Sequence, residues 1–333
     1  MLAATLLSLL FAASAFGASR TTPPAGSIVV RAGTTTSGEF STLVAAVASL
    51  PNDSSSRSIF IFPGTYNGQV SITRAGPLTI YGFTQDTSTY TGNQVNIVAA
   101  GNATAAGSND ASGTLRIHKN DFKLYNVNVK NVLGAGVQAI AISQYGSRVG
   151  LYACGFYGYQ DTLYANQGTQ VYLKGYIEGA TDFIFGRLGA AYFGGNTIAV
   201  KAAGWVSASG RESNDAFSYV FNKNTIVLAS GAASNTAGNW YFGRPWGNFA
   251  KVVFKNTVLN VAPNRALWSQ WSSSEPRTDS ILFGDFNTTG SGASGLARPS
   301  FATALSSSQA AAFSISSAVG SDFASWVDAA YIV

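Results

Sequence analysis

Four short segments place acidic, amide or guanidinium side chains among apolar residues, in a chain whose charged residues amount to only 11% of its length. They contain the five polar residues Gln138, Gln160, Asp161, Asp182 and Arg244. A pair of carboxyl groups can divide two tasks between them, one ionised as a nucleophile and the other keeping a proton as a general acid. A single Gln-Asp pair is more often structural, so the inference depends on the whole set.

The spacing of these residues suggests how they could meet. Gln138 and Gln160 are 22 positions apart, and Asp161 and Asp182 are 21 apart. If the chain winds into coils of about this length, equivalent positions stack on neighbouring strands, ~4.8 Å apart. Two carboxyl groups at that separation influence each other's ionisation. The spacing therefore predicts a carboxylate dyad on one face of a coiled fold.

The elements that would position this dyad are short strands in a repeating pattern. A small or amide residue lies between apolar strand segments at positions 126, 155, 175, 196, 224 and 256, with intervals of 29, 20, 21, 28 and 32 residues. A period in this range with two or three strands per copy is typical of a solenoid. A β-sandwich would require hairpin turns, and Asn67-Gly68 is almost the only such signal. We expect an all-β, right-handed parallel β-helix.

The two ends of the chain differ from the coils. Residues 1–17 combine an apolar run with small residues and predict a signal peptide, which leaves residues 18–333 as one secreted catalytic domain. No later stretch is long enough to span a membrane. Residues 41–50 have apolar positions at helical spacing and predict a short N-terminal capping helix. The apolar residues 313–333 should pack along the coils or cap them.

The remaining reactive residues do not suggest another kind of site. Cys154 is the only cysteine, so we expect a buried thiol and no intramolecular disulfide, and His118 is the only histidine. We therefore predict no metal site and no cofactor. The net charge is +5, but basic residues are scattered singly, which argues against nucleic-acid binding. Sequons at Asn52, Asn102 and Asn287 fit a secreted glycoprotein.

Three motifs together resemble the signatures of pectin methylesterases. They are Gln-Asp-Thr-Leu at 160–163, Asp-Phe-Ile-Phe-Gly at 182–186 and Gly-Arg-Pro-Trp at 243–246. The resemblance extends more loosely from about residue 27 to the C-terminus and is strongest to fungal members. It implies a pectinesterase, a carboxylic ester hydrolase that converts methylesterified homogalacturonan to pectate and methanol through an aspartyl acyl-enzyme. It also implies a monomer that needs no cofactor.

The resemblance assigns a role to each of the five polar residues. Asp182 matches the nucleophile that attacks the C6 carbonyl carbon. Asp161 matches the acid that protonates the departing methanol and then, as a base, activates water. Gln138 and Gln160 match the amide donors that stabilise the oxyanion. Arg244 matches the arginine that holds the nucleophile ionised and aimed.

Four further residues are candidates for substrate binding. Trp246 matches an aromatic platform for a sugar ring. Phe185 and Tyr164 lie beside the motifs and could line the cleft, although core packing is an equal alternative. Arg187 directly follows the second motif, at a place that is usually uncharged in this family. It could contact substrate carboxylates or simply lie on the surface.

Several other functions stay open from the sequence. A pectate lyase would require a calcium site built from several carboxylates, and a galacturonan hydrolase would use two carboxyl groups around a glycosidic bond. A related esterase or thioesterase could act on another substrate. An inactive pectin-binding scaffold is a further alternative, which the intact Asp161, Asp182 and Arg244 disfavour.

Overall fold

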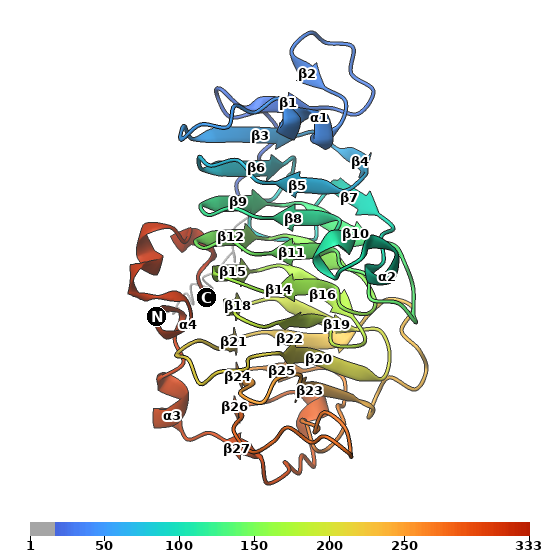
Figure 1. Ribbon diagram of the computed structural model, residues 1–333, viewed down its shortest axis with the longest axis vertical. Coiled ribbons are helices and arrows are strands. Elements are labelled where there is room, and N and C mark those ends of the chain that lie inside the picture. The colour runs from blue at the N-terminus through green and yellow to red at the C-terminus, as the bar shows by residue number, and fades with distance from the viewer. Residues whose placement is uncertain (1–16) are drawn as a thin grey trace, which may run out of the picture.

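The computed structural model describes residues 17–333, so the predicted signal peptide lies outside the described residues except for Gly17. The chain winds into a long stack of coils (Figure 1), and successive strands of a coil join three different sheets. Strands on neighbouring coils pair in parallel, as between β9, β12 and β15. The predicted all-β parallel β-helix is confirmed.

The three sheets are named here by their strands, in spatial order. Sheet I contains β2 (Glu39–Phe40), β1 (Ile28–Val30), β3 (Arg57–Ile61), β6 (Leu78–Gly82), β9 (Phe122–Tyr125), β12 (Val149–Tyr152), β15 (Thr169–Leu173), β18 (Ala190–Gly194), β21 (Tyr219–Asn222), β24 (Lys251–Lys255), β26 (Leu282–Phe286) and β27 (Ala302–Ala304). Sheet II contains β25 (Val258–Leu259), β22 (Thr225–Leu228), β19 (Thr197–Val200), β16 (Tyr176–Gly179), β13 (Gly155–Tyr157), β10 (Asn128–Asn131), β7 (Val95–Ala99) and β4 (Gly64–Asn67). Sheet III contains β23 (Trp240–Pro245), β20 (Gly204–Ser209), β17 (Ile184–Gly186), β14 (Leu163–Ala165), β11 (Ile142–Gln144), β8 (Leu115–Ile117) and β5 (Val70–Ile72).

The corner between sheets I and II is made by one residue in the left-handed conformation. This residue has φ 52° at Asn126, 48° at Ala153, 53° at Lys174 and 54° at Lys223. One such residue bends the chain sharply enough for the next strand to begin two positions later. The predicted repeat marks these corners: the small or amide residues at 126, 175, 196, 224 and 256 lie between strands, and Gly155 is the first residue of β13.

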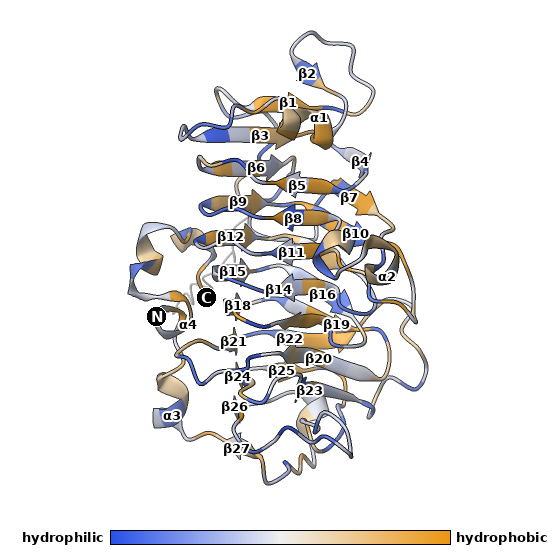
Figure 2. Cartoon of the chain, viewed as in Figure 1, coloured by the Kyte–Doolittle hydropathy of each residue, from blue (hydrophilic) through white to orange (hydrophobic). Residues whose placement is uncertain are grey.

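Stacked side chains fill the interior of the coils. The ring centroids of Phe193 and Phe221 are 4.4 Å apart, and those of Phe221 and Phe254 are 4.1 Å apart with nearly parallel planes. Asparagines stack beside the corner, where Asn224 Oδ1 accepts a hydrogen bond from the backbone N–H of Asn196 at 2.8 Å. Figure 2 shows the apolar residues concentrated on the strands and the polar ones in the connecting loops.

Across the described residues 17–333, four short α-helices lie at the ends and edges of the stack. They are α1 (Leu43–Ala48), α2 (Ala103–Ala106), α3 (Ser307–Ala311) and α4 (Ile315–Val319). The same described part of the chain has 3-10 helices at Asp110–Ser112, Ser291–Ala293, Ser321–Ser325 and Ala329–Tyr331. α1 contacts β1 and β5 at the N-terminal end of the stack, and it is shorter than the predicted range of 41–50.

The C-terminal segment packs along the side of sheet I (Figure 1), as predicted for residues 313–333. α4 contacts β15, β18 and β21, and Trp326 is buried.

The predicted buried thiol is also confirmed, because Cys154 is fully buried and its burial raises the pKa of the thiol to about 12. Within residues 17–333, no helix is long and apolar enough to cross a membrane.

The stacked phenylalanines generate a stability prediction. Phe221→Ala removes the middle ring of the stack and leaves a cavity, so we expect it to lower the free energy of unfolding by roughly 3–5 kcal/mol. Phe217→Ala is the matched control, since Phe217 is 41% exposed, and its effect should stay within about 0.5 kcal/mol. Equilibrium unfolding in urea measures both changes. Equal changes in the free energy of unfolding for the two variants would contradict a stabilising role of the internal stack.

Candidate active site

The corners between sheets II and III carry Gln160, Asp161 and Asp182, the polar residues of the motifs at 160–163 and 182–186. Asp161 lies between β13 and β14, and Asp182 lies between β16 and β17, one coil further on. Isolated parallel bridges connect Gln138 to Gln160 and Gln160 to Thr181, so the residues stack across three coils. The spacings of 22 and 21 residues therefore correspond to single coils, as the sequence predicts.

Both aspartates adopt an uncommon backbone conformation. The φ angle is 63° at Asp161 and 50° at Asp182, in the left-handed region. Aspartate enters this region more readily than most residues, because its short side chain can bond locally. Residues held in such conformations often cluster at active sites, where the surrounding structure maintains them. Here the register of the coils on both sides holds the two corners in place.

A cavity of about 260 Å³ lies at these corners and brings all five predicted polar residues together. It also includes Trp246 and Phe185 from the candidate substrate contacts. Its lining residues are Asn109, Gln138, Gln160, Asp161, Asp182, Phe185, Ala208, Arg244, Trp246 and Trp271. Tyr164 does not line this cavity, and Arg187 lines a neighbouring one.

Arg244 holds the carboxylate of Asp182 through two parallel hydrogen bonds. Its Nε donates to Oδ1 at 2.9 Å and its Nη2 donates to Oδ2 at 2.7 Å. The guanidinium carbon lies 3.6 Å from the ring centroid of Trp205 and 4.3 Å from that of Trp271. A planar cation held between two aromatic rings has little freedom to rotate, so the carboxylate is held in one orientation.

The two carboxyl groups differ in their electrostatic surroundings. Burial, together with the charge of the nearby Asp182, raises the pKa of Asp161 to about 8, although the charge of Arg244 lowers it. Burial also raises the pKa of Asp182, and the hydrogen bonds and the charge of Arg244 oppose this increase. Asp161 is therefore suited to keep a proton, whereas the pairing with Arg244 favours the charged form of Asp182.

A row of stacked rings leads away from the cavity along sheet III. Tyr164 stacks on Phe185 with centroids 4.4 Å apart, Tyr145 meets the edge of Tyr164, and His118 stacks on Tyr145 at 4.7 Å. Tyr164 is thus placed behind Phe185 rather than in the cavity. His118 also forms a hydrogen bond with Asp110 at 2.9 Å, as expected for a structural histidine.

Four residues of the site were not predicted from the sequence. Trp205 and Trp271 lie against Arg244, Asn109 comes from the loop after α2, and Ala208 also lines the cavity. Ala208 is the register partner of Arg244 in the pairing of β20 with β23, but the two residues are 36 positions apart, which exceeds the predicted period. Trp271 and Asn109 belong to irregular loops, which carry no periodic signal.

The arrangement has the groups needed for nucleophilic attack on an ester. It contains a carboxyl group paired with a guanidinium, a second carboxyl group with a raised pKa, and two primary amides, all lining one cavity. Within the described residues there is no group of three or more His, Cys, Asp or Glu that could hold a metal ion.

Comparisons with known proteins agree with this chemistry. The chain matches the family model Pectinesterase over residues 27–322. A pectinesterase of Aspergillus niger is 41% identical over 340 aligned residues, which cover 100% of both chains. The crystal structure of a deglycosylated pectin methylesterase from Aspergillus niger has a TM-score of 0.86 and 36% identity, covering 94% of this chain and 100% of that one. A carrot pectin methylesterase has a TM-score of 0.81 and 26% identity, with coverages of 94% and 98%.

The raised pKa of Asp161 predicts a gain in stability when this carboxyl group is removed. Unfolding returns Asp161 to its ordinary pKa near ~3.9, so the native state loses stability as pH rises from there toward about 8. The side chain introduced by Asp161→Asn cannot ionise. At pH 7 we therefore expect the free energy of unfolding of this variant to exceed that of the wild type by roughly 1–3 kcal/mol. Urea unfolding at pH 4 and pH 7 measures this. If the difference in free energy of unfolding between the variant and the wild type does not grow from pH 4 to pH 7, burial does not disfavour the ionised form of Asp161.

Proposed function

The chain belongs to the pectinesterase family, and we propose that its two corner aspartates perform the hydrolysis of pectin methyl esters. The activity is that of a carboxylic ester hydrolase, which releases methanol from the C6 methyl ester of a galacturonate residue. The observation that carries the assignment of residues is the cavity that unites Asp161, Asp182 and Arg244 with two amides.

In the first half of the reaction Asp182 acts as the nucleophile. One of its oxygens attacks the C6 carbonyl carbon, and the carbonyl oxygen becomes an oxyanion that accepts hydrogen bonds from Gln138 and Gln160. The tetrahedral intermediate collapses as the bond to the methoxy oxygen breaks. Asp161 gives its proton to that oxygen, so methanol leaves and an acyl-enzyme anhydride remains on Asp182.

In the second half Asp161 acts as the base. Its carboxylate takes a proton from a water molecule, and the resulting hydroxyl oxygen attacks the acyl carbon. Collapse of the second tetrahedral intermediate breaks the bond to Asp182, which returns as a carboxylate to Arg244. The polymer leaves with a free carboxyl group, which then loses its proton to solvent, and Asp161 holds its proton again. The raised pKa of Asp161 suits both directions of transfer near neutral pH.

Aromatic side chains beside the cavity are suited to sugar rings. Trp246 and Trp271 line the cavity and are only partly buried, so they offer apolar ring faces to the polymer. Phe185 lines the cavity while being 3% exposed, and we assign Tyr164 the task of supporting it. Arg187 would act further along the polymer, in the neighbouring cavity.

The proposed function also has consequences for the export and the domain organisation of the protein. We propose that residues 1–17 are a signal peptide, that residues 18–333 form a single secreted catalytic domain, and that it works as a monomer. Asn52 and Asn287 are exposed and Asn102 is half-buried, so the first two sequons are the more accessible for glycosylation.

Removal of the nucleophile tests the mechanism. Asp182→Ala should lower kcat for methanol release from highly methylated pectin by at least about 10⁴-fold, with an unchanged circular-dichroism spectrum. Asp121→Ala is a matched control, because Asp121 also has a left-handed φ of 56° and is held by two hydrogen bonds from Arg148. Comparable losses in both variants would remove Asp182 from the mechanism. A fall in polymer viscosity alongside methanol would indicate a lyase or a glycosidic hydrolase.

The pH dependence of kcat/KM tests the division of tasks between the aspartates. With fully methylated pectin, which has no titrating carboxyl groups, activity should fall as pH rises through about 8, because Asp161 loses its proton. It should also fall at low pH, where Asp182 becomes protonated. Arg244→Lys should move that acidic limb to higher pH, since an ammonium cannot form both hydrogen bonds. An unshifted acidic limb would argue against control of Asp182 by Arg244.

A further inference from the structure

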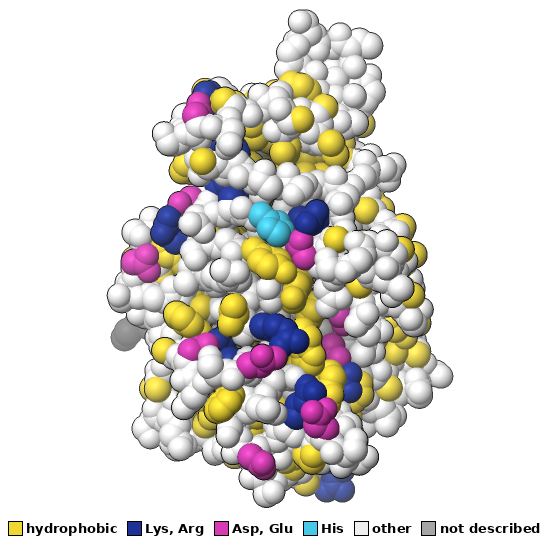
Figure 3. Space-filling view, in the orientation of Figure 1, with side chains coloured by type: hydrophobic (Ala, Val, Ile, Leu, Met, Phe, Trp, Pro, Cys, Tyr) yellow, Lys and Arg dark blue, Asp and Glu magenta, His cyan; other side chains and the backbone are white. Residues whose placement is uncertain are grey.

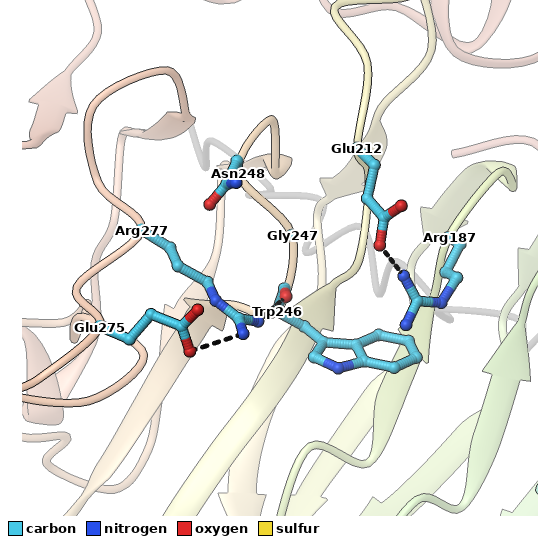
Figure 4. A pocket seen from close by; sticks show the side chains of 7 residues that line it. All are labelled: Arg187, Glu212, Trp246, Gly247, Asn248, Glu275 and Arg277. Carbon is cyan, nitrogen blue, oxygen red and sulfur yellow. Dashed lines mark hydrogen bonds and ion pairs between the residues drawn. The ribbon is translucent and has the colours of Figure 1, made fainter.

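The lining of the catalytic cavity is held by different contacts on its different sides. A second cavity, of about 420 Å³, shares Trp246 with it and contains two arginine–glutamate pairs, Arg187–Glu212 and Arg277–Glu275. Figure 4 shows the indole between the two guanidinium groups, which contact its ring and its backbone carbonyl oxygen. In Figure 3, basic and acidic side chains adjoin one another on this face of the molecule. One of the two amides of the catalytic cavity is held in another way, by the backbone and an uncharged side chain.

This amide is Gln138, which lies in an exposed loop between β10 and β11. Residues 134–138 are all exposed and include two glycines. Glycine has more backbone freedom than any other residue, so contacts must fix the loop if Gln138 is to keep one position. The second amide, Gln160, has parallel bridges to a coil on each side, to Gln138 and to Thr181. Among the isolated bridges of the described residues, Gln138 has a partner on one side only.

Asn131 ties the two ends of this loop together. It is the last residue of β10 and is only 3% exposed. Its Oδ1 accepts a hydrogen bond from the backbone N–H of Leu133 at 3.2 Å. Its Nδ2 donates to the backbone carbonyl oxygen of Ile140, also at 3.2 Å. A single buried carboxamide therefore closes the loop on both sides of Gln138.

Asn131 also binds a second segment, which contacts Gln138 directly. Its Nδ2 donates to the carbonyl oxygen of Gly101 at 2.8 Å. Two residues later, the backbone N–H of Ala103 donates to the carbonyl oxygen of Gln138 at 2.9 Å. This segment follows β7 and so belongs to the preceding coil, on the side where Gln138 has no bridge. Asn131 thus fixes both the loop that carries Gln138 and the segment that supports it.

We propose that Asn131 is a positioning residue for the reaction, because it keeps the carboxamide of Gln138 where the oxyanion forms. The inference rests on the proposed function, in which Gln138 donates a hydrogen bond to that oxyanion. Such a donor lowers the barrier only when it is already in place, and a misplacement of about 1 Å can cost about 100-fold in rate. Asn131 does not line the catalytic cavity, so it acts through Gln138.

A double-mutant cycle in kcat for methanol release tests the proposal. Gln138→Ala should lower kcat by about 10²–10³-fold, as expected for the loss of an oxyanion donor. Asn131→Ala should lower kcat at least about tenfold and leave KM within about twofold, since the oxyanion exists only after substrate has bound. In the Gln138→Ala background, the same substitution should lower kcat less than about twofold, because the amide that it positions is gone. An equal loss in both backgrounds would overturn the proposal.

Asn224→Ala is the control for a purely structural effect. Asn224 is also a buried amide, which donates to the carbonyl oxygen of Phe193 at 2.9 Å and accepts from the backbone N–H of Asn196 at 2.8 Å. It lies at a corner between sheets I and II and does not line the catalytic cavity. Its substitution should destabilise the fold and leave kcat within about twofold of the wild type. A loss of kcat as large as that of Asn131→Ala would contradict a specific role of Asn131.

Ala103→Pro loosens the support of Gln138 without changing Asn131. Ala103 is the first residue of α2, a position that accepts proline, so the substitution removes mainly the N–H that donates to Gln138. It should lower kcat at least severalfold with little change in KM. Ser307→Pro places proline at the first residue of α3, away from the catalytic cavity, and should leave kcat unchanged. Equal kcat in these two variants would mean that the segment does not position Gln138.

Hydrogen exchange measured by nuclear magnetic resonance provides a readout that needs no activity. The backbone N–H groups of Ala103 and Ala139 donate to Gln138 and Gln160. Both should exchange at least about tenfold faster in Asn131→Ala than in the wild type, but not in Asn224→Ala. Unchanged exchange in Asn131→Ala would refute the proposal. Failure of the proposed function is distinguishable, because Gln138→Ala would then keep its kcat while the difference in exchange persisted.

Discussion

The register between neighbouring coils is the constraint on which the other features of this protein depend. Parallel hydrogen bonding places equivalent residues of successive coils one strand spacing apart, and a single left-handed residue at the corner between sheets I and II keeps strand lengths matched. The same register sets Asp161 beside Asp182, although they are 21 residues apart. A slip of one residue would turn both side chains to other faces of the coil.

Electrostatics then differentiates two chemically identical groups. Burial disfavours charge on both aspartates, and only Asp182 receives two hydrogen bonds from Arg244. That contact spans two coils, because Asp182 precedes β17 whereas Arg244 belongs to β23, with β20 between them. The stacked interior keeps these coils at constant separation, so the stability of the core and the asymmetry of the dyad have one origin.

The aromatic residues around the site combine support with recognition. Trp205 and Trp271 restrict Arg244, while Trp246 and Phe185 face the cavity. Trp246 also separates the catalytic cavity from the one that contains the two arginine–glutamate pairs.

The sequence by itself determined the coiled all-β fold and the set of Asp, Gln and Arg residues at the site. It could do so because the strands recur every 20 to 32 residues, so residues about one coil apart, such as Asp161 and Asp182, stack in space, and because three motifs resemble those of pectin methylesterases. The turning residues themselves were not predicted, since a left-handed residue at Ala153 or Lys174 has no distinctive side chain. Only the tertiary structure decided that Trp271 lies against Arg244, that Tyr164 lies behind Phe185, and that Arg187 and Arg277 share a cavity. Several of these residues belong to loops of irregular length, and their contacts depend on packing that no local spacing records.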